Sequence, residues 1–247
     1  MIGSSSLFRA YWKLEKLLVP GLSSSQTRYE ETLGRYVTPS VRWLDLGCGR
    51  RLLPEWRRDA ERALISRAER TVGVDLDFDS LRDNQSVDLL CLSSVSELPF
   101  ADASFSLVTA NMVMEHVSSP EGMLAELHRV LMPGGHLIFH TPNARAFPTA
   151  VARILPDPVK QAMARLLDGR ASKDVFPTHY RVNDSRTIRR HAAAARFEVA
   201  ELQLVSSSAT FSLVLPLAFL ELLWIRAVRA PGREEQRSNI IAVLTRP

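Results

Sequence analysis

The chain is predicted to be an α/β protein whose largely parallel sheet carries helices on both faces. Two observations lead to this class: short apolar, β-branched runs alternate with helical segments, and each strand–helix–strand unit spans about thirty residues. Units of that length join parallel strands through right-handed crossovers. Strands are predicted at 41–46, 71–75, 87–92, 105–110 and 135–141, and helices at 52–66, 77–84 and 120–131.

Residues that break secondary structure fall where this assignment needs them. Pro120 is suited to a first helical position, with Ser118 or Ser119 before it as the cap. The Pro-Gly-Gly run at 133–135 is expected to end that helix and lead into the next strand, which stops at Pro142.

Length and composition limit the class of protein. A chain of 247 residues holds one large α/β domain, with room for an added lobe. Two cysteines, Cys48 and Cys91, are too few for a disulfide framework or a Cys-rich zinc site, and they suit a reducing cytoplasm. No metal-ligand spacing is present. The net charge of +4 is spread without a basic arm, so nucleic-acid binding is not expected.

The chain divides into four predicted parts. Residues 1–34 form an N-terminal helical cap whose apolar face is expected to cover the core, in preference to closing a pocket or touching a membrane. Residues 35–145 form the ligand-binding core, and 146–185 an inserted helical lobe. Residues 186–247 complete the sheet and include an apolar helix at 209–228.

The apolar segment at 209–225 is too interrupted to cross a membrane. It contains Pro216 and Glu221, whereas a spanning helix needs roughly 20 uninterrupted apolar residues. Three interpretations remain open, in descending order of preference: a buried helix, the wall of a pocket, and a peripheral contact with a membrane.

The corner after the first strand is the predicted ligand site, since ligands of such sheets bind at the carboxyl ends of the strands. The corner reads Gly47-Cys48-Gly49, without the third glycine of a dinucleotide motif or the Lys-Ser/Thr pair of a phosphate loop. Glycines allow a ligand to approach the backbone closely. Asp45 is suited to a ligand ammonium group, with loop tethering as the alternative.

The second strand ends in Asp75, a carboxylate suited to accepting two vicinal ribose hydroxyls. The alternative role is that of a helix N-cap, for which Asp77 and Asp79 are the better candidates. We therefore favour the ribose role for Asp75.

Four segments together carry a family resemblance: LDLGCG, VGVDLD, SELPFADASFSLVTANMVMEHV and HRVLMPGGHLIFHTPN. In order and spacing they resemble the motifs of class I S-adenosylmethionine-dependent methyltransferases, closest to the small-molecule branch called methyltransferase type 11 or 12. The match covers about residues 35–145. It implies a Rossmann-like, seven-stranded, mostly parallel sheet with a small helical insertion or cap, and S-adenosyl-L-methionine as cofactor.

The resemblance also implies roles for individual residues. Relatives often carry an acidic residue for the adenine amino group where this chain has Ser94, and a further glycine where it has Arg51. The implied cofactor-binding residues are Asp45 near the amino group, Gly47, Cys48 and Gly49 along the methionine part, Asp75 at the ribose, Leu76, Ser94 and Val95 at the adenine, and Asn111 and Met112 beside the methionine.

The implied reaction is methyl transfer to a small acceptor, hydrophobic or lipid-linked, with oxygen as the favoured acceptor atom. Rate acceleration is expected mainly from positioning, and His179 and His140 are the candidate bases. The expected location is the cytoplasm, including the inner face of the membrane. Two alternatives remain: a cofactor-binding module without turnover, and a membrane-associated methyltransferase that uses 209–225 as its contact.

Overall fold

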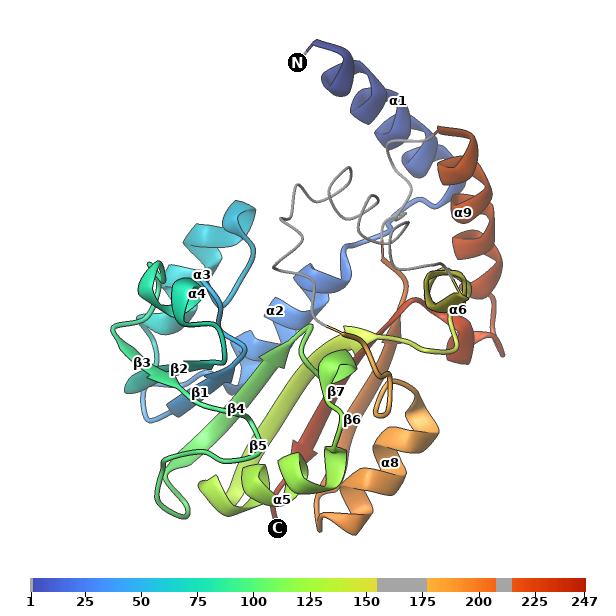
Figure 1. Ribbon diagram of the computed structural model, residues 1–247. Helices are drawn as coiled ribbons and strands as arrows, with labels where there is room; N and C mark the ends of the chain where they lie inside the picture. The colour runs from blue at the N-terminus through green and yellow to red at the C-terminus, as the bar shows by residue number, and fades with distance from the viewer. Residues whose placement is uncertain (1, 155–176, 208–214) are drawn as a thin grey trace.

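The computed structural model describes residues 2–154, 177–207 and 215–247 and contains a seven-stranded sheet (Figure 1). The strand order is β3-β2-β1-β4-β5-β7-β6, with β1 to β5 parallel and β7 antiparallel to both its neighbours. The predicted class is confirmed. The strands are β1 (Arg42–Leu46), β2 (Arg70–Asp75), β3 (Leu89–Leu92), β4 (Phe105–Asn111), β5 (Leu131–Pro142), β6 (Glu198–Val205) and β7 (Asn239–Thr245).

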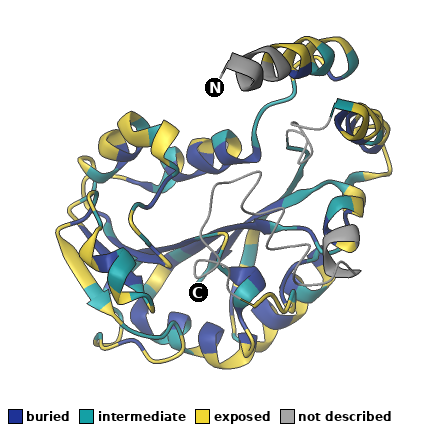
Figure 2. Cartoon of the chain, turned by 45° about the horizontal axis from the view of Figure 1, so that its top comes forward, coloured by how far each residue is buried: buried dark blue, intermediate teal, exposed yellow. Residues whose placement is uncertain are grey.

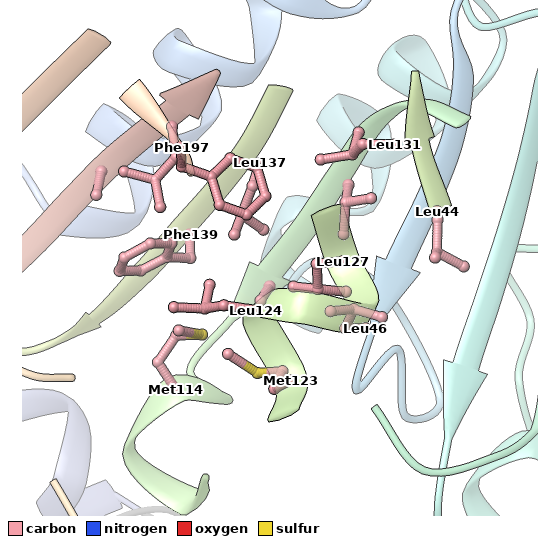
Figure 3. Packing of buried hydrophobic residues seen from close by; sticks show 14 of the residues in the cluster. Leu44, Leu46, Met114, Met123, Leu124, Leu127, Leu131, Leu137, Phe139 and Phe197 are labelled. Atoms are coloured by element: carbon pink, nitrogen blue, oxygen red, sulfur yellow. The ribbon is translucent and has the colours of Figure 1, made fainter. Parts of the chain in front are cut away.

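Helices cover both faces of the sheet. One face carries α2 (Ser25–Tyr36) and α3 (Arg58–Ile65), and the other α5 (Pro120–Val130) and α8 (Ser185–Ala194). The short α4 (Phe78–Arg82) links β2 to β3. Figure 3 shows the larger core, where Met123, Leu124 and Leu127 of α5 pack toward Leu137 and Phe139 of β5. Burial on both faces explains why the central strands are continuous apolar runs.

A third apolar cluster joins the two ends of the chain. Tyr11 and Val19, in and just after α1 (Ile2–Leu18), pack with Ala218, Leu222 and Ile225 of α9 (Leu215–Val228). Figure 1 shows the two helices beside each other at one end of the molecule. The first helix, which is expected to cover the core, packs its buried side on α9 in this separate cluster.

Some element boundaries differ from the predictions. The helix expected at 52–66 begins at Arg58 and follows a 3₁₀ turn, η1 (Glu55–Arg57), since Pro54 precedes that turn in extended conformation. The strand expected at 135 already begins at Leu131, and the Pro-Gly-Gly run lies within it as an irregularity of the pairing with β4.

The inserted lobe and the apolar helix are described only in part. In the lobe, α6 (Phe147–Ile154) and residues 177–185 are described, and its predicted centre at 158–169 lies outside the described residues. The apolar helix begins at Leu215, and 208–214 likewise lie outside. Two short turns, η2 (Met114–His116) and η4 (Glu234–Gln236), complete the fold. No helix in the described ranges combines the length and apolar character needed to cross a bilayer.

Candidate functional site

The site lies where the strand order reverses, because β1 pairs with β2 on one side and with β4 on the other. Gly47 follows β1 at φ +64°, and a Cβ built on it would lie 2.5 Å from Cγ2 of Val113, in the loop after β4. Only glycine satisfies both the backbone conformation and this close approach. Gly49 has φ +48° with no heavy atom near its hypothetical Cβ, so open space adjoins the loop there.

Cys48 turns its side chain away from this opening. Its thiol is fully buried, and a Cβ on Gly73 of β2 would lie 2.7 Å from Sγ. Burial raises the pKa of the Cys48 thiol. The Cys48 amide donates to the carbonyl of Val74 at 3.1 Å. Cys48 thus lies in the layer between loop and sheet, with its thiol against Gly73 and its amide bonded to Val74.

Asp75 at the tip of β2 is held in place by two backbone amides. Gly49 N–H donates to Oδ2 at 2.8 Å and Asp77 N–H to Oδ1 at 2.9 Å. A carboxylate has about four lone-pair positions, so each oxygen can still accept a ligand hydroxyl. The α4 cap is Asp77, as predicted. The next side chain, Leu76, is 64% exposed and offers an apolar surface beside the carboxylate.

Asp45 on β1 is buried in a small polar network. The Thr109 hydroxyl donates to its Oδ1, and the Trp43 indole N–H donates to Thr109 Oγ1 at 2.6 Å. Burial raises the pKa of Asp45 to about 8, against the opposing effect of the Thr109 hydrogen bond. The adjacent Tyr29 of α2 is also buried, and burial together with the Asp45 charge raises its pKa. At neutral pH this carboxyl is largely protonated, and a nearby cation would favour its charged form.

Helix α2 is joined to the strand tips by Gln26. Its Oε1 accepts from Asn111 Nδ2 at 3.2 Å, and its Nε2 donates to Glu30 at 3.2 Å. Arg57 of η1 in turn donates from Nε to Glu30 Oε2 at 2.8 Å. The sequence did not single out Gln26, because its partner Asn111 is 85 residues away and no local motif marks it.

Asn111 is the last residue of β4, and Met112 is the first residue of the loop that follows it. Met112 has φ +56°, a conformation that costs a residue with a Cβ roughly 1 kcal/mol or more. Its N–H donates to the carbonyl of His140 at 2.8 Å. Such strain gathers at functional sites, where surrounding contacts hold it in place.

His140 lies near the carboxyl end of β5, where it is buried and not exposed to the opening. It is 1% exposed and stacks on Tyr29 with ring centroids 5.5 Å apart. Nδ1 lies 3.0 Å from Asn111 Oδ1, and Nε2 lies 3.2 Å from Asn239 Nδ2. Since an amide nitrogen only donates, Nε2 is the acceptor and Nδ1 carries the proton. Burial lowers the pKa of His140 to about 3, so the ring is neutral and orients Asn111.

The second candidate base, His179, has an exposed side chain. Its backbone N–H donates to the carbonyl of Glu115 at 2.7 Å, and His116 Nδ1 lies 2.8 Å from the carbonyl of Pro177. The Glu115 carboxylate accepts from Thr141 Oγ1 at 3.0 Å. These contacts fasten the 177–180 segment to the loop after β4, which borders the site.

The two departures from the family pattern have different structural settings. Arg51 is 11% exposed and pairs with Glu55 at 2.6 Å and with the buried Glu61 at 3.2 Å, so it anchors the loop to α3. Ser94 Oγ accepts from the Ser96 amide at 3.2 Å in a local turn, and Val95 packs against the core.

Within the described residues, no three His, Cys, Asp or Glu side chains group as a metal site would require.

Comparisons with known proteins agree with this geometry. The profile of a family described as a methyltransferase domain matches residues 44–139. The ubiquinone biosynthesis O-methyltransferase of Xanthomonas campestris pv. campestris (strain B100) is 31% identical over 163 residues, covering 62% of this chain and 67% of that protein. The malonyl-[acyl-carrier protein] O-methyltransferase of Erwinia pyrifoliae is 34% identical over 106 residues, 41% of this chain and 37% of that protein.

A solved structure shows the same fold. The geranyl diphosphate C-methyltransferase of Streptomyces coelicolor A3(2), in complex with Mg²⁺, geranyl diphosphate and S-adenosyl-L-homocysteine, aligns with TM-score 0.53 at 16% identity. The alignment covers 90% of this chain and 77% of that one.

The fold, the strand-tip geometry and these relatives place the chain in the class I S-adenosylmethionine-dependent methyltransferases. The resemblance inferred from the four sequence segments is confirmed. The chain spans 58% and 42% of the lengths of two ubiquinone biosynthesis O-methyltransferases that it matches, from Hahella chejuensis and Idiomarina loihiensis.

The buried neutral His140 predicts a specific loss of stability in acid. Its pKa is near 6.5 in the unfolded chain and about 3 in the folded protein, so the unfolded state binds the proton first. The contribution of His140 to the free energy of unfolding is fully present above pH 6.5. It decreases by up to about 1.4 kcal/mol per pH unit as pH falls toward 3. Urea unfolding of His140→Gln should show a shallower acid decline than wild type.

The exposed His179 provides the matched control for that measurement. His179→Gln should retain the wild-type acid decline, because it leaves the buried His140 in place. Equal pH dependence of wild type and His140→Gln would contradict a neutral buried His140.

Proposed function

We propose that this chain binds S-adenosyl-L-methionine at the strand tips and transfers its methyl group to a small acceptor. The observation that carries the proposal is the placement of Asp75. Its carboxylate is pre-oriented by the Gly49 and Asp77 amides, with open space at Gly49 on one side and the exposed Leu76 on the other. An acceptor-only group beside an apolar surface fits a ribose that carries a purine.

The other end of the site suits the amino-acid part of that cofactor. Gly47 leaves the loop backbone accessible after β1, and Asp45, two residues earlier on β1, is buried. The ammonium group of a bound cofactor would lower the pKa of Asp45 and favour the ionised carboxylate. The positive charge of the cofactor would then have an ionic partner. Asn111, oriented by His140 and Gln26, and Met112 would border the same part of the ligand.

Catalysis would come mainly from positioning. When bound, S-adenosylmethionine supplies an electrophilic methyl group. The residues of this chain would hold the acceptor in line with that methyl and exclude water from the opening. No buried carboxylate needs to face the sulfur, because charge leaves the sulfur in the transition state and such a contact would favour the ground state.

We further propose an oxygen acceptor on a hydrophobic or lipid-linked small molecule. Relatives named as ubiquinone biosynthesis and malonyl-[acyl-carrier protein] O-methyltransferases support oxygen. His179, exposed on the segment fastened beside the site, is the proposed general base for a hydroxyl acceptor. We assign His140 the role of positioning Asn111, in place of the predicted role as a base, because both its ring nitrogens are engaged in hydrogen bonds.

Asp75→Asn should weaken binding of S-adenosyl-L-homocysteine. Hydrogen bonds to a charged group contribute about 1.5–3 kcal/mol, so the dissociation constant should rise roughly tenfold or more. Titration calorimetry measures it, with Asp79→Asn on the exposed side of α4 as the control that binds like wild type. Unchanged affinity in Asp75→Asn, with the fold intact by circular dichroism, would remove the ribose role.

The high pKa of Asp45 makes cofactor binding pH-dependent. Because the carboxyl must lose its proton to pair with an ammonium group, affinity for S-adenosyl-L-homocysteine should increase as pH rises toward about 8, by up to tenfold per unit. Asp45→Asn should bind more weakly and with little pH dependence over the same range. A flat wild-type profile would show that Asp45 does not meet the ammonium.

Turnover separates an enzyme from a binding module. The protein is incubated with S-adenosylmethionine and pooled phenolic and lipid extracts, and mass spectrometry follows both S-adenosylhomocysteine release and compounds that gain a methyl group. With a hydroxyl acceptor identified, His179→Gln should lower kcat and leave cofactor affinity unchanged. Cofactor binding without turnover on any extract would favour the non-catalytic module.

A further inference from the structure

A cavity of about 340 Å³ lies at the carboxyl end of β6, the last strand at one edge of the sheet, and is called here the arginine cavity. Its lining comes from the linker between α1 and α2, from α2, from the end of β6, and from the residues that follow α9 and η4. Figure 2 shows the linker, largely of intermediate burial, running from α1 to α2. Small-molecule sites begin at roughly 300 Å³, so the arginine cavity is large enough for part of a ligand.

Three arginines line this cavity: Arg28, Arg229 and Arg237. Arg28 Nε donates to the Ser23 hydroxyl at 3.2 Å, and Arg237 Nη1 donates to the carbonyl of Leu204 at 3.1 Å. Ser23 and Leu204 belong to the lining themselves, so these hydrogen bonds hold both guanidinium groups at the wall of the cavity.

The arginine charges are only weakly compensated. The described residues that line the arginine cavity include no Asp or Glu. Glu31 pairs with Arg28 at 3.1 Å on the surface, and Glu234, in an adjoining cavity, lies 3.7 Å from Arg237. Arg229 forms no ion pair within the described part of the chain and donates to a backbone carbonyl instead. Exposed ion pairs contribute little, so a multivalent anion can compete with both carboxylates.

A buried hydroxyl in the same lining lacks a partner. Ser206, which follows β6, lines the arginine cavity, and its Oγ is buried without a hydrogen bond to any described residue. Buried polar atoms are nearly always hydrogen-bonded, so an exception calls for an explanation. A ligand oxygen in the cavity would accept the hydrogen bond that this hydroxyl can donate.

The arginine cavity lies on the same edge of the sheet as the cofactor site. Both β5 and β6 run antiparallel to β7, so their carboxyl ends point the same way. Val205 pairs in register with Asn239, whose side chain contacts His140 near the end of β5. Three strand spacings separate β4 from β6, about 14 Å at roughly 4.8 Å each. An elongated molecule can therefore reach from the cavity to the end of β4.

Helix α2 contributes residues to both places. Gln26 accepts from Asn111 in the cofactor site, and Arg28, two residues later, lines the arginine cavity. Between them, the Ser25 amide donates to the Ser207 hydroxyl at 3.3 Å. The first turn of α2 is thus fastened to the end of β4 and to the segment after β6.

The chemistry of the lining favours a phosphate group over a carboxylate. A guanidinium presents donors in a planar fork that matches phosphate oxygens, and hydrogen bonds between two charged groups are the strong ones. Three guanidinium groups and a hydroxyl supply more donors than the two oxygens of a single carboxylate can use. A phosphate or diphosphate has the oxygens and the negative charge to engage them together.

We propose that the arginine cavity binds a phosphate or diphosphate group of the methyl acceptor. Arg28, Arg229 and Arg237 hold the phosphate oxygens, and Ser206 donates a further hydrogen bond. The rest of the acceptor extends along the strand tips toward Asn111. Binding of the anion follows from the cavity alone, whereas its assignment to the acceptor rests on the proposed function.

Titration calorimetry of the full chain with inorganic diphosphate tests the anion site. Wild type should bind diphosphate, and more weakly as salt is raised. Arg28→Gln with Arg229→Gln should raise the dissociation constant about tenfold or more, because two charge-assisted contacts are lost. Arg237→Gln alone should raise it in the same direction and serves as a second, independent variant.

The matched control is Arg186→Gln with Arg189→Gln, which removes the same charge at two exposed positions on α8 and should bind diphosphate like wild type. Binding of S-adenosyl-L-homocysteine is measured for every variant and should be unchanged. Absence of diphosphate binding by wild type, or equal affinity in the cavity variants and the control, would overturn the anion site. Loss of S-adenosyl-L-homocysteine binding by wild type, with diphosphate still bound, would overturn the proposed function and leave the anion site standing.

Two phosphate esters then distinguish the source of the phosphate. Octyl phosphate represents a lipid-linked acceptor and glucose 1-phosphate a soluble one. Tighter binding of the first supports a lipid-linked acceptor, and tighter binding of the second a soluble one, provided that Arg28→Gln with Arg229→Gln weakens it. Failure of both esters to bind would overturn the assignment of the arginine cavity to the acceptor.

Discussion

The close approach of two loops at the reversal of strand order is the constraint on which the site depends. Gly47 passes so near Val113 that a Cβ would lie 2.5 Å from its methyl group. The loop after β1 is thereby held against the loop after β4, and the Gly49 amide then reaches the Asp75 carboxylate at the tip of β2. Three strands that are distant in sequence thus present their ends to one opening. Any residue larger than glycine at 47 would separate them.

Buried polar groups around this opening are satisfied by one another. Trp43, Thr109 and Asp45 form one chain of hydrogen bonds, and His140, Asn111 and Gln26 form another. Such networks are costly if one member lacks its partner, and they hold their members in defined rotamers when complete. The network accounts for a neutral, enclosed His140 and for an Asp45 whose charge state is open to influence by a ligand.

The site and the third apolar cluster are held together differently. At the strand tips, orientation comes from hydrogen bonds between buried groups, and the exposed large apolar side chains there include Leu76, Phe78, Leu92 and Met112. The helices α1 and α9 are instead joined by buried apolar side chains that include Tyr11, Leu222 and Ile225.

The sequence by itself determined the class of sheet, the glycine corner, the Asp75 position and the family, because period, turn residues and short motifs are local properties of the chain. Only the tertiary structure decided which groups meet. Gln26 binds Asn111 across 85 residues, Asn239 binds His140 across 99, and Tyr11 packs on α9 near the opposite end of the chain. No local pattern records such contacts, and burial then set the pKa of Asp45 and His140 and turned Cys48 inward.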